Sequence, residues 1–194
     1  MKDMVSELRI ALVATVSLAV LLCGVYPVVV WGLAQGLFPH KANGSLITAG
    51  GRIIGSQLLG QNFIEAKYFH PRPSAAGETG YDGGNSGGTN LGPISKKLID
   101  AVKERVAAYR AENQLPAAIP VPADAVTASA SGLDPDISLK NAVFQAARVA
   151  RARGMREETV RELIAKNTKG RDLGIFGEER VNVLSLNLSL DGKL

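Results

Sequence analysis

Cysteine and histidine are scarce in this chain, and their scarcity excludes several kinds of site. The sequence has one cysteine and two histidines, Cys23, His40 and His70. A lone cysteine has no partner for an intrachain disulfide, and two histidines give little material for a metal cluster. A hydrolase would have to combine His70 with Ser74 or Ser86. We favour a loop histidine bonded to backbone, and predict no catalytic residue and no metal ligand.

Formal charge is missing from one long stretch near the N-terminus, between Ile10 and Trp31. At about 1.5 Å per residue a helix here is roughly 33 Å long, enough to cross the roughly 30 Å hydrocarbon layer of a membrane. A cleaved signal peptide would have a shorter apolar core, and a buried helix of a soluble domain would be amphipathic or shorter. The apolar run beyond Cys23 also disagrees with a lipoprotein signal. We therefore predict one transmembrane helix at residues 10–31.

The charges that flank this helix predict its orientation. Lys2 and Arg9 precede it, and the next basic residue is Lys41. Basic residues accumulate on the cytoplasmic side of membrane helices, whereas long domains cross largely regardless of their charge. We therefore expect the N-terminus in the cytoplasm and the rest of the chain outside it. The expected parts are a cytoplasmic head at 1–9, a tether at 32–44 and one extracytoplasmic domain at 45–194.

Small residues recur at every fourth position of the predicted membrane helix, at Ala11, Thr15, Ala19 and Cys23. Such a stripe lets the backbone of another helix approach closely, although these residues are common in any membrane helix. We interpret the stripe as a candidate packing surface for a partner helix. Pro27 has no N–H to donate to the carbonyl of Cys23, so we also predict a kink in the second half of the helix.

The predicted domain begins with a hairpin and a long loop. Two β-branched runs within 45–57 are separated by Gly50-Gly51, which tolerates the positive φ angles of a tight turn. From Pro71 to Pro93 glycine is too frequent for a helix or a strand, so this segment is predicted to be a loop. Long loops in compact domains are usually functional or disordered. We favour an ordered binding loop.

An amphipathic helix and a second loop are predicted next. Apolar residues from Leu98 to Tyr109 recur on one face of a helix at 94–113, with charged residues elsewhere on its surface. Prolines 116, 120 and 122 then enforce extended chain. Residues 124–136 pass through Ser and Thr to a Gly-Leu-Asp-Pro turn, which predicts a second shaped loop.

Two helices and a strand complete the predicted domain. Ser138 can cap a helix that runs to Arg153, Gly154 suits the left-handed position that ends it, and a second helix covers 156–166. Residues 181–190 alternate apolar with polar, with one change of phase at Val183-Leu184, and predict a bulged strand. The fold class is therefore α+β, with one N-terminal transmembrane helix and a single mixed domain.

Two motifs would give the domain a ligand. Ser86-Gly87-Gly88 is similar to the Ser-Gly-Gly core of the ABC-transporter signature, but its flanking Leu and Gln are missing and no Walker A string occurs. The helix pair has helix-turn-helix spacing, which would make the chain a membrane-tethered DNA-binding regulator. We prefer a helical hairpin covering the sheet, because the nearby arginines are spread around the helices and the expected location holds no DNA. The residues of that alternative are Ala150, Gly154, Val160 and Leu163, with Arg148, Arg151, Arg153, Arg156 and Arg161.

Many ordered strings in the chain resemble one family, KdpC, the C subunit of the Kdp ATP-driven potassium pump. The resemblance covers nearly the whole chain. The strings that carry it are Gly55-Ser56-Gln57, Gly60-Gln61 with Phe63, Lys67-Tyr68-Phe69-His70, Arg72-Pro73-Ser74, Ser86-Gly87-Gly88-Thr89-Asn90-Leu91-Gly92-Pro93, Val121-Pro122, Thr127-Ala128-Ser129, Ser131-Gly132-Leu133-Asp134-Pro135, Gly177-Glu178 and Val181-Asn182-Val183-Leu184. Pro71 and Thr89 depart from the family pattern, in which we expect Gly and Ser.

The resemblance implies a subunit of a bacterial inner-membrane complex with KdpA, KdpB and KdpF, without a catalytic site of its own. Members of the family have been called catalytic chaperones that raise the ATP affinity of KdpB. ATP is cytoplasmic, whereas we expect this domain outside, so we prefer assembly, stabilisation and outer gating of the potassium entrance. Direct nucleotide contact through Ser86, Gly87, Gly88 and Gln145 is the second hypothesis. No cofactor is expected on the chain itself, and ATP is implied only through the complex.

Candidate binding residues lie in the loops before the helix at 94–113. They are Tyr68, His70, Arg72, Ser86, Gly87, Gly88 and Asn90. We expect membrane lipid around the anchor and no nucleic acid among the ligands.

Overall fold

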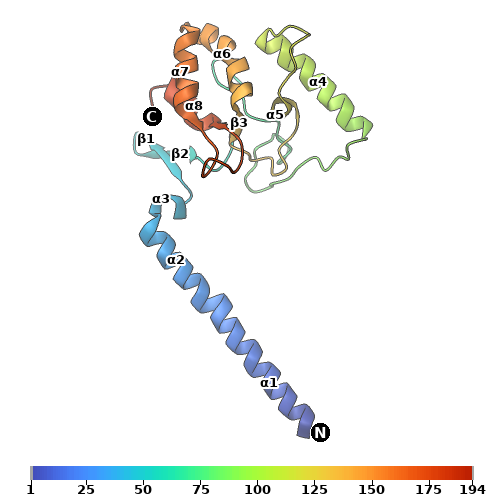
Figure 1. Ribbon diagram of the computed structural model, residues 1–194, viewed down its shortest axis with the longest axis vertical. Helices are drawn as coiled ribbons and strands as arrows, with labels where there is room; N and C mark the ends of the chain where they lie inside the picture. Colours follow the sequence, from blue (N-terminus) through green and yellow to red (C-terminus); the bar gives the residue numbers. More distant parts are fainter. Residues whose placement is uncertain (1, 194) are drawn as a thin grey trace. The chain divides into compact units, whose positions relative to one another are not determined.

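The computed structural model describes residues 2–193 and divides into two compact units, with the boundary between Leu46 and Ile47. The first unit consists of α1 (Lys2–Ala19), η1 (Val20–Val25), α2 (Tyr26–Leu37) and α3 (Pro39–Ala42) (Figure 1). Residues Met4–Leu37 form one apolar helix long enough to cross a membrane, and an 18-residue stretch of it has a mean hydropathy of 2.3 and no buried residue. The predicted span at 10–31 lies inside this helix.

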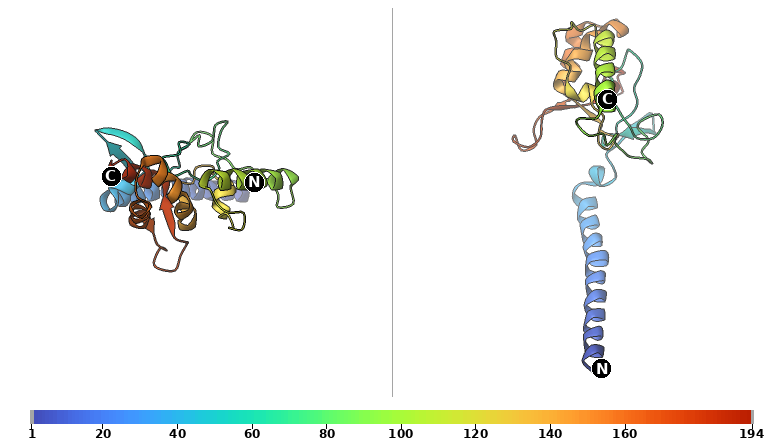
Figure 2. Two further views of the ribbon diagram at one scale, coloured as in Figure 1. Left: turned by 90° about the horizontal axis from the view of Figure 1, so that it is seen from above. Right: turned by 90° about the vertical axis from the view of Figure 1, so that its right-hand side faces the viewer.

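The helix accommodates Pro27 without the predicted kink. The segment before it, η1, is a π-helix, and the N–H of Tyr26 donates to the carbonyl of Leu21, five residues back. This change of hydrogen-bond pattern takes up the disturbance that a proline makes in an α-helix. Figures 1 and 2 show no sharp bend at this point. The expectation of a kink is therefore wrong, because the helix changes type instead of direction.

The segment predicted as a tether, 32–44, is largely helical. Helix α2 continues past Trp31 to Leu37, and α3 adds one more turn after Phe38. The side chain of Asn43 donates to the carbonyl of Pro39 at 2.7 Å and thereby closes that turn. Proline at the first helical position explains why a new turn starts there, since its missing N–H has no partner in the first turn of a helix.

The second unit begins with the predicted hairpin. Strands β1 (Leu46–Ala49) and β2 (Arg52–Ser56) form a two-stranded sheet. Gly50 and Gly51 have φ angles of 57° and 76°, the left-handed values that a two-residue hairpin turn requires and that glycine adopts without strain.

A second, antiparallel sheet has the strand order β3-β5-β4. Its strands are β3 (Asp136–Ser138), β4 (Thr168–Lys169) and β5 (Arg180–Asn182). Ile137 lies opposite Val181, and both side chains are buried beneath the helices.

Helices α6 (Leu139–Arg153) and α7 (Glu157–Asn167) form the predicted hairpin over this sheet. The Ser138 hydroxyl accepts the N–H of Asn141 at 3.1 Å, and Gly154 ends α6 with a φ angle of 64°. Both helix boundaries therefore follow from the capping residues that the sequence contains. The main core is formed between these helices, the sheet and the loop before α4, by Phe69, Ile137, Ala142, Ala146, Val149, Ala150, Val160, Ile164, Val181, Val183 and Leu186.

The predicted strand at 181–190 is wrong beyond Asn182. The chain forms a helix there, α8 (Val183–Leu190), and the Asn182 side chain caps it by accepting the N–H of Ser185 at 3.0 Å. The change of phase at Val183-Leu184 is thus a strand-to-helix junction and not a bulge. The alternating pattern arises because α8 is buried on two sides, with Leu186 in the main core and Leu184 and Leu188 packed against Ile47 in a smaller one.

Helix α4 (Lys96–Asn113) lies within the range predicted for it and packs against α6. Its apolar face is only partly covered, since Tyr109 is buried while Ile99 is exposed. The second predicted loop, 124–136, begins inside a short helix, α5 (Ala123–Val126), and ends at β3. The glycine-rich segment before α4 contains no helix or strand, as predicted. The α+β fold class with one N-terminal apolar helix is confirmed.

Candidate functional site

An irregular segment, residues 65–72, crosses the domain with Phe69 in the main core and is held there by side chains. On α8, the Asn187 amide accepts the N–H of Phe69 at 2.8 Å and donates to its carbonyl at 3.0 Å. On α6, the Gln145 amide does the same for His70, at 2.7 and 3.1 Å. Buried backbone groups need hydrogen-bond partners. These two amides supply the partners that a neighbouring strand would otherwise give.

Two arginines donate hydrogen bonds to other backbone carbonyls of the same segment. Buried Arg148 donates to the carbonyls of Ala66 and Tyr68 at 2.6 and 2.9 Å. Arg153 donates to the carbonyl of Lys67 at 2.7 Å. Burial lowers the pKa of the Arg148 guanidinium and the nearby Glu112 carboxylate opposes that shift. We refer to residues 65–72 with these side-chain partners as the clamped segment.

The clamped segment is linked to α4 and α5 through a buried polar chain. The Tyr109 hydroxyl donates to the side-chain oxygen of Asn141 at 2.8 Å. The same oxygen accepts a hydrogen bond from the Gln145 amide at 2.9 Å. Asn141 also donates to the Asp124 carboxylate at 3.0 Å. Because each of these polar groups is hydrogen-bonded to the next, this part of the interior contains polar side chains that all have partners.

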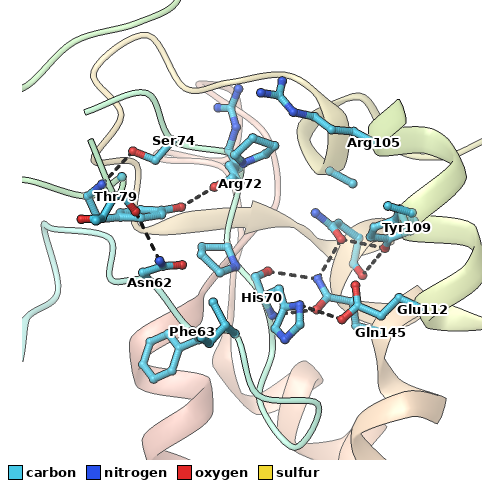
Figure 3. A pocket seen from close by; sticks show the side chains of 18 residues that line it. Asn62, Phe63, His70, Arg72, Ser74, Thr79, Arg105, Tyr109, Glu112 and Gln145 are labelled. Carbon is cyan, nitrogen blue, oxygen red and sulfur yellow. Dashed lines mark hydrogen bonds and ion pairs between the residues drawn. The ribbon is translucent and has the colours of Figure 1, made fainter. Parts of the chain in front are cut away.

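A half-open cavity of about 380 Å³ lies beside this chain, between the loops and α4 (Figure 3). The imidazole of His70 lies in it with Nδ1 2.9 Å from the Glu112 carboxylate. Arg72 lines the cavity and is paired with Asp134 at 2.6 Å. The residues that line it include Asn62, Phe63, His70, Arg72, Ser74, Thr79, Tyr81, Arg105, Tyr109, Glu112, Asn141 and Gln145.

The electrostatics of this cavity follow from burial and from the His70 contact. The hydrogen bond from His70 holds the pKa of the Glu112 carboxyl below its usual value, with a smaller contribution from Arg148. Burial raises the pKa of the Tyr109 and Tyr81 hydroxyls, so both remain protonated donors at physiological pH. The Tyr81 hydroxyl donates to the carbonyl of Arg72.

These groups are arranged for binding one another and not for nucleophilic attack. The Ser74 hydroxyl donates to the carbonyl of Gly132 at 2.7 Å, and the Ser86 hydroxyl donates to the carbonyl of Ser131 at 2.9 Å. His70 is occupied by Glu112 and by the carbonyl of Glu65, which lies 3.1 Å from Nε2. The His-Ser combinations considered from the sequence are therefore not assembled. Within residues 2–193 no group of three or more His, Cys, Asp or Glu is placed to hold a metal ion.

The Ser86-Gly87-Gly88 string packs against the second loop. The N–H of Gly87 donates to the carbonyl of Ser131 at 3.0 Å. A Cβ on Gly88 would lie 2.8 Å from the carbonyl oxygen of Ala130. Gly88 therefore allows two backbones to approach closely, which explains this glycine without a phosphate ligand.

Gln145 lies apart from that string and has no spare hydrogen-bonding capacity in the described structure. Its Oε1 accepts from His70 and from Arg148, and its Nε2 donates to His70 and to Asn141. An amide has two acceptor sites and two donors, so all four are used. The cavity that Gln145 lines does not include Ser86, Gly87 or Gly88 among its lining residues. Direct nucleotide contact through this set remains a prediction that the geometry does not favour.

The other candidate binding residues do not converge on one place. The Tyr68 hydroxyl donates to the Asp191 carboxylate at 3.1 Å, and the ring has Arg153 over its face at 5.1 Å. Asn90 is exposed and has a left-handed φ angle of 50°. Of the residues predicted as a binding loop, His70 and Arg72 line the cavity, and the others serve contacts within the domain or lie on its surface.

Two of the four residues of the small-residue stripe line a shallow apolar groove on the membrane helix. Ala19 and Cys23 lie in it with Gly24, and valines at positions 20, 25, 28 and 29 form its sides. The groove coincides with the π-helical segment η1. Thr15 and Ala11 lie about one and two turns before it on α1.

The helix-turn-helix alternative is not supported by the placement of the arginines. Arg148 is buried and bonded to backbone, Arg153 pairs with Asp191 at 2.8 Å, and Arg161 pairs with Glu157 at 2.6 Å. A DNA-binding face needs several basic side chains free to reach phosphates. The helix pair instead buries Ala150 and Val160 in the main core.

Sequence reasoning missed the residues that organise the clamped segment, namely Asn187, Arg148 and Asn141. Asn141, Gln145 and Arg148 are spaced as one face of α6, adjacent to the apolar face formed by Ala142, Ala146 and Val149. Three polar residues at helical spacing beside an apolar face indicate a polar contact inside the domain, and this pattern is present in the sequence.

Comparisons with known proteins give one consistent family. A family model described as "KdpC: K+-transporting ATPase, c chain" matches residues 8–192. The chain is 55% identical over 188 residues to a protein of Nitratidesulfovibrio vulgaris, covering 97% of this chain and 95% of that protein. It is 53% identical over 191 residues to one of Koribacter versatilis, covering 98% and 95%. A Mycobacterium tuberculosis protein is 56% identical over 167 residues, covering 86% and 88%. All three relatives are named potassium-transporting ATPase KdpC subunit.

Proposed function

The chain belongs to the KdpC family, and from this premise we propose that it is an accessory subunit that assembles and stabilises an ATP-driven potassium pump. The observation that carries the proposal is the apolar helix Met4–Leu37, whose most apolar stretch has no buried residue. Such a helix is stable only when lipid or other membrane helices cover it. A single anchor of this kind suits a subunit that joins a larger membrane assembly.

The groove on this helix supports helix-to-helix packing. Small residues at Ala19, Cys23 and Gly24 form its floor. Without a hydrophobic drive inside a bilayer, helices associate where small side chains let their backbones come close. The proposed packing surface is the stripe of Ala11, Thr15, Ala19 and Cys23, and the proposed partners are the subunits KdpA, KdpB and KdpF.

The structure of the domain supports a role in binding and stabilising other subunits of the pump. Its buried polar groups are bonded to one another, and its cavity presents His70 already paired with Glu112. We therefore assign no chemical step to the chain itself. The proposed effect on the ATPase subunit is indirect: a correctly assembled complex holds KdpB in a form with higher ATP affinity. The four engaged hydrogen-bonding sites of Gln145 favour this over direct contact with ATP.

The proposed location of the domain is outside the bacterial inner membrane, with the N-terminus in the cytoplasm. Lys2 and Arg9, which precede the uncharged run at 10–31, support this orientation. Ala107 is exposed on α4, so Ala107→Cys offers a thiol for a membrane-impermeant reagent. Labelling in intact spheroplasts supports an outer domain, and labelling only after lysis contradicts it. The unsubstituted chain, whose one thiol lies in the apolar helix, is the control.

The assembly role is tested by recovery of the other pump subunits with this chain. Leu in place of Ala11, Ala19 and Cys23 fills the proposed packing surface and should reduce recovery of the complex by about tenfold. Ser17 lies about half a helical turn from Thr15, so Ser17→Leu is a matched small-to-large control. Full recovery with the triple variant would contradict the packing surface. If the unsubstituted chain itself recovers no pump subunit, the proposed function is wrong.

A further inference from the structure

The loop that joins β4 to β5 carries three large apolar side chains in water. Leu173 is 89% exposed, Ile175 68% and Phe176 61%. None of the three belongs to either core of the domain. We call these three residues the apolar tip. Contiguous exposed apolar side chains of this kind usually mark a site of interaction with another molecule.

The apolar tip is a defined turn. Asp172 and Phe176 form an antiparallel bridge, with hydrogen bonds of 2.8 Å from the Asp172 N–H and 2.9 Å from the Phe176 N–H. Between them, Leu173 and Gly174 have left-handed φ angles of 54° and 78°. Figure 2 shows this loop, in red-brown, standing clear of the helices in both views. The backbone therefore holds the apolar side chains outward.

Four of the six charged residues around the tip are paired within the chain. Arg171 lies 2.6 Å from Glu178, and Arg180 lies 3.2 Å from Asp172 and 3.3 Å from Asp136. From Lys169 to Arg180 the basic residues are Lys169, Arg171 and Arg180, and the acidic residues are Asp172, Glu178 and Glu179. The loop thus has no net charge.

This balance decides between a membrane and a protein as the occupant. Loops and helices that bind bilayer surfaces usually combine apolar side chains with unpaired Lys or Arg, which anionic lipid attracts. The apolar tip lacks that excess. A few clustered apolar or aromatic side chains surrounded by paired charges are instead typical of the anchor of a protein interface, with a polar rim around it.

We propose that Leu173, Ile175 and Phe176 dock into an apolar pocket on another protein subunit of the pump. This inference rests on the proposed function and adds the surface by which the domain, as distinct from the membrane helix, joins the complex. The rigid turn lowers the entropy lost on docking, because the backbone is already ordered.

Photocrosslinking in membranes that contain the whole complex tests this proposal. A photoreactive phenylalanine analogue replaces Phe176 in one variant and Ile94, which is 93% exposed before α4, in a control variant. We expect a product between this chain and another pump subunit from position 176, at about ten times the yield from position 94. Products with lipid alone, with a second copy of this chain, or equal yields from both positions would overturn the proposal.

A second measurement separates this proposal from the proposed function. The variant Leu173→Asn, Ile175→Asn and Phe176→Gln removes the apolar tip and keeps the backbone, since Asn tolerates the left-handed φ of Leu173. The crosslink from a photoreactive group at position 172 to the partner should fall by about tenfold. Unchanged crosslinking with normal recovery of the complex overturns the docking surface alone. Loss of all recovery from the unsubstituted chain overturns the proposed function.

Discussion

The clamped segment and the apolar tip are both irregular stretches of the same domain, and they are stabilised in opposite ways. In the clamped segment, Asn187 and Gln145 bond both backbone polar groups of Phe69 and His70. In the apolar tip, the backbone is bonded to itself and the side chains of Leu173 and Phe176 contact neither core. The fold therefore supplies hydrogen bonds to the backbone of the clamped segment, whereas it leaves the apolar side chains of the tip exposed.

This difference separates what holds the domain together from what it offers to others. Removing a partner from the clamped segment leaves buried backbone groups without hydrogen bonds, which is costly. Removing an apolar side chain from the tip exposes nothing new to water. Substitutions in the first region should therefore act on folding, and substitutions in the second on association.

The largest effect is expected from Asn187→Ala. It leaves the N–H and carbonyl of buried Phe69 without partners, so the free energy of unfolding should fall by about 3 kcal/mol. Denaturant titration of the full chain in detergent, followed by near-UV circular dichroism, measures this change. Asn62→Ala, at an exposed asparagine, is the control and should change it by less than about 0.5 kcal/mol. Equal changes in the free energy of unfolding for the two variants would contradict the role given to Asn187 in the clamped segment.

Substituting one glycine in the packed loops, Gly132, and one in the apolar tip, Gly174, compares how much a side chain destabilises each region. Gly132 has a φ angle of 69°, and a Cβ there would lie 2.6 Å from Ala76 Cβ and 2.8 Å from the Gly87 oxygen. Gly174 has a φ angle of 78° and nothing within 4 Å. Gly174→Ala should therefore cost only the backbone strain, about 1 kcal/mol, whereas Gly132→Ala adds a clash and should cost about 2 to 3 kcal/mol. The same titration ranks them.

A smaller effect, present at neutral pH and lost at low pH, is expected from Glu112→Gln. Because the His70 contact lowers the pKa of Glu112 in the folded chain, this carboxylate stabilises the fold above its unfolded pKa of roughly 4.3. That contribution is lost as pH falls through the folded pKa. Glu112 is partly exposed, so it should be below about 1 kcal/mol. Stability measured from pH 7 to pH 3 should converge for the two chains at the acid end, whereas the exposed control Glu104→Gln should parallel the unsubstituted chain throughout.

The smallest effect on folding is expected at the tip. Leu173→Asn removes an exposed side chain and places a residue that tolerates the left-handed backbone, so the free energy of unfolding should change by less than about 0.5 kcal/mol. A larger loss in the same titration would mean that the tip supports the fold, which would remove the contrast between the two regions.

Much of the fold follows from local signals in the sequence. The uncharged run predicts the membrane helix, Gly50-Gly51 predicts the hairpin, and Ser138 with Gly154 predicts the limits of α6. The family resemblance, carried by strings throughout the chain, is confirmed by the match over residues 8–192. Each of these signals depends on neighbours in sequence, which is why the sequence alone sufficed.

The failures came where distant residues decide the structure. The alternation at 181–190 is that of a strand, but Asn182 caps a helix whose leucines enter two different cores. The clamped segment depends on contacts between residues far apart in the chain, such as Phe69 with Asn187. The prediction of Gln145 as a nucleotide contact, which stays a prediction, likewise comes from local sequence, and that sequence does not show the hydrogen bonds of its amide to His70 and Asn141.

This division of roles, folding through the clamped segment and docking through the apolar tip, is what we propose for the domain. Its most direct test is the recovery of the other pump subunits with the chain substituted at Leu173, Ile175 and Phe176, purified in parallel with the unsubstituted chain and quantified by mass spectrometry. We expect the same unfolding midpoint for both chains and reduced recovery for the substituted one. Full recovery, or an earlier unfolding midpoint in the substituted chain, would contradict it.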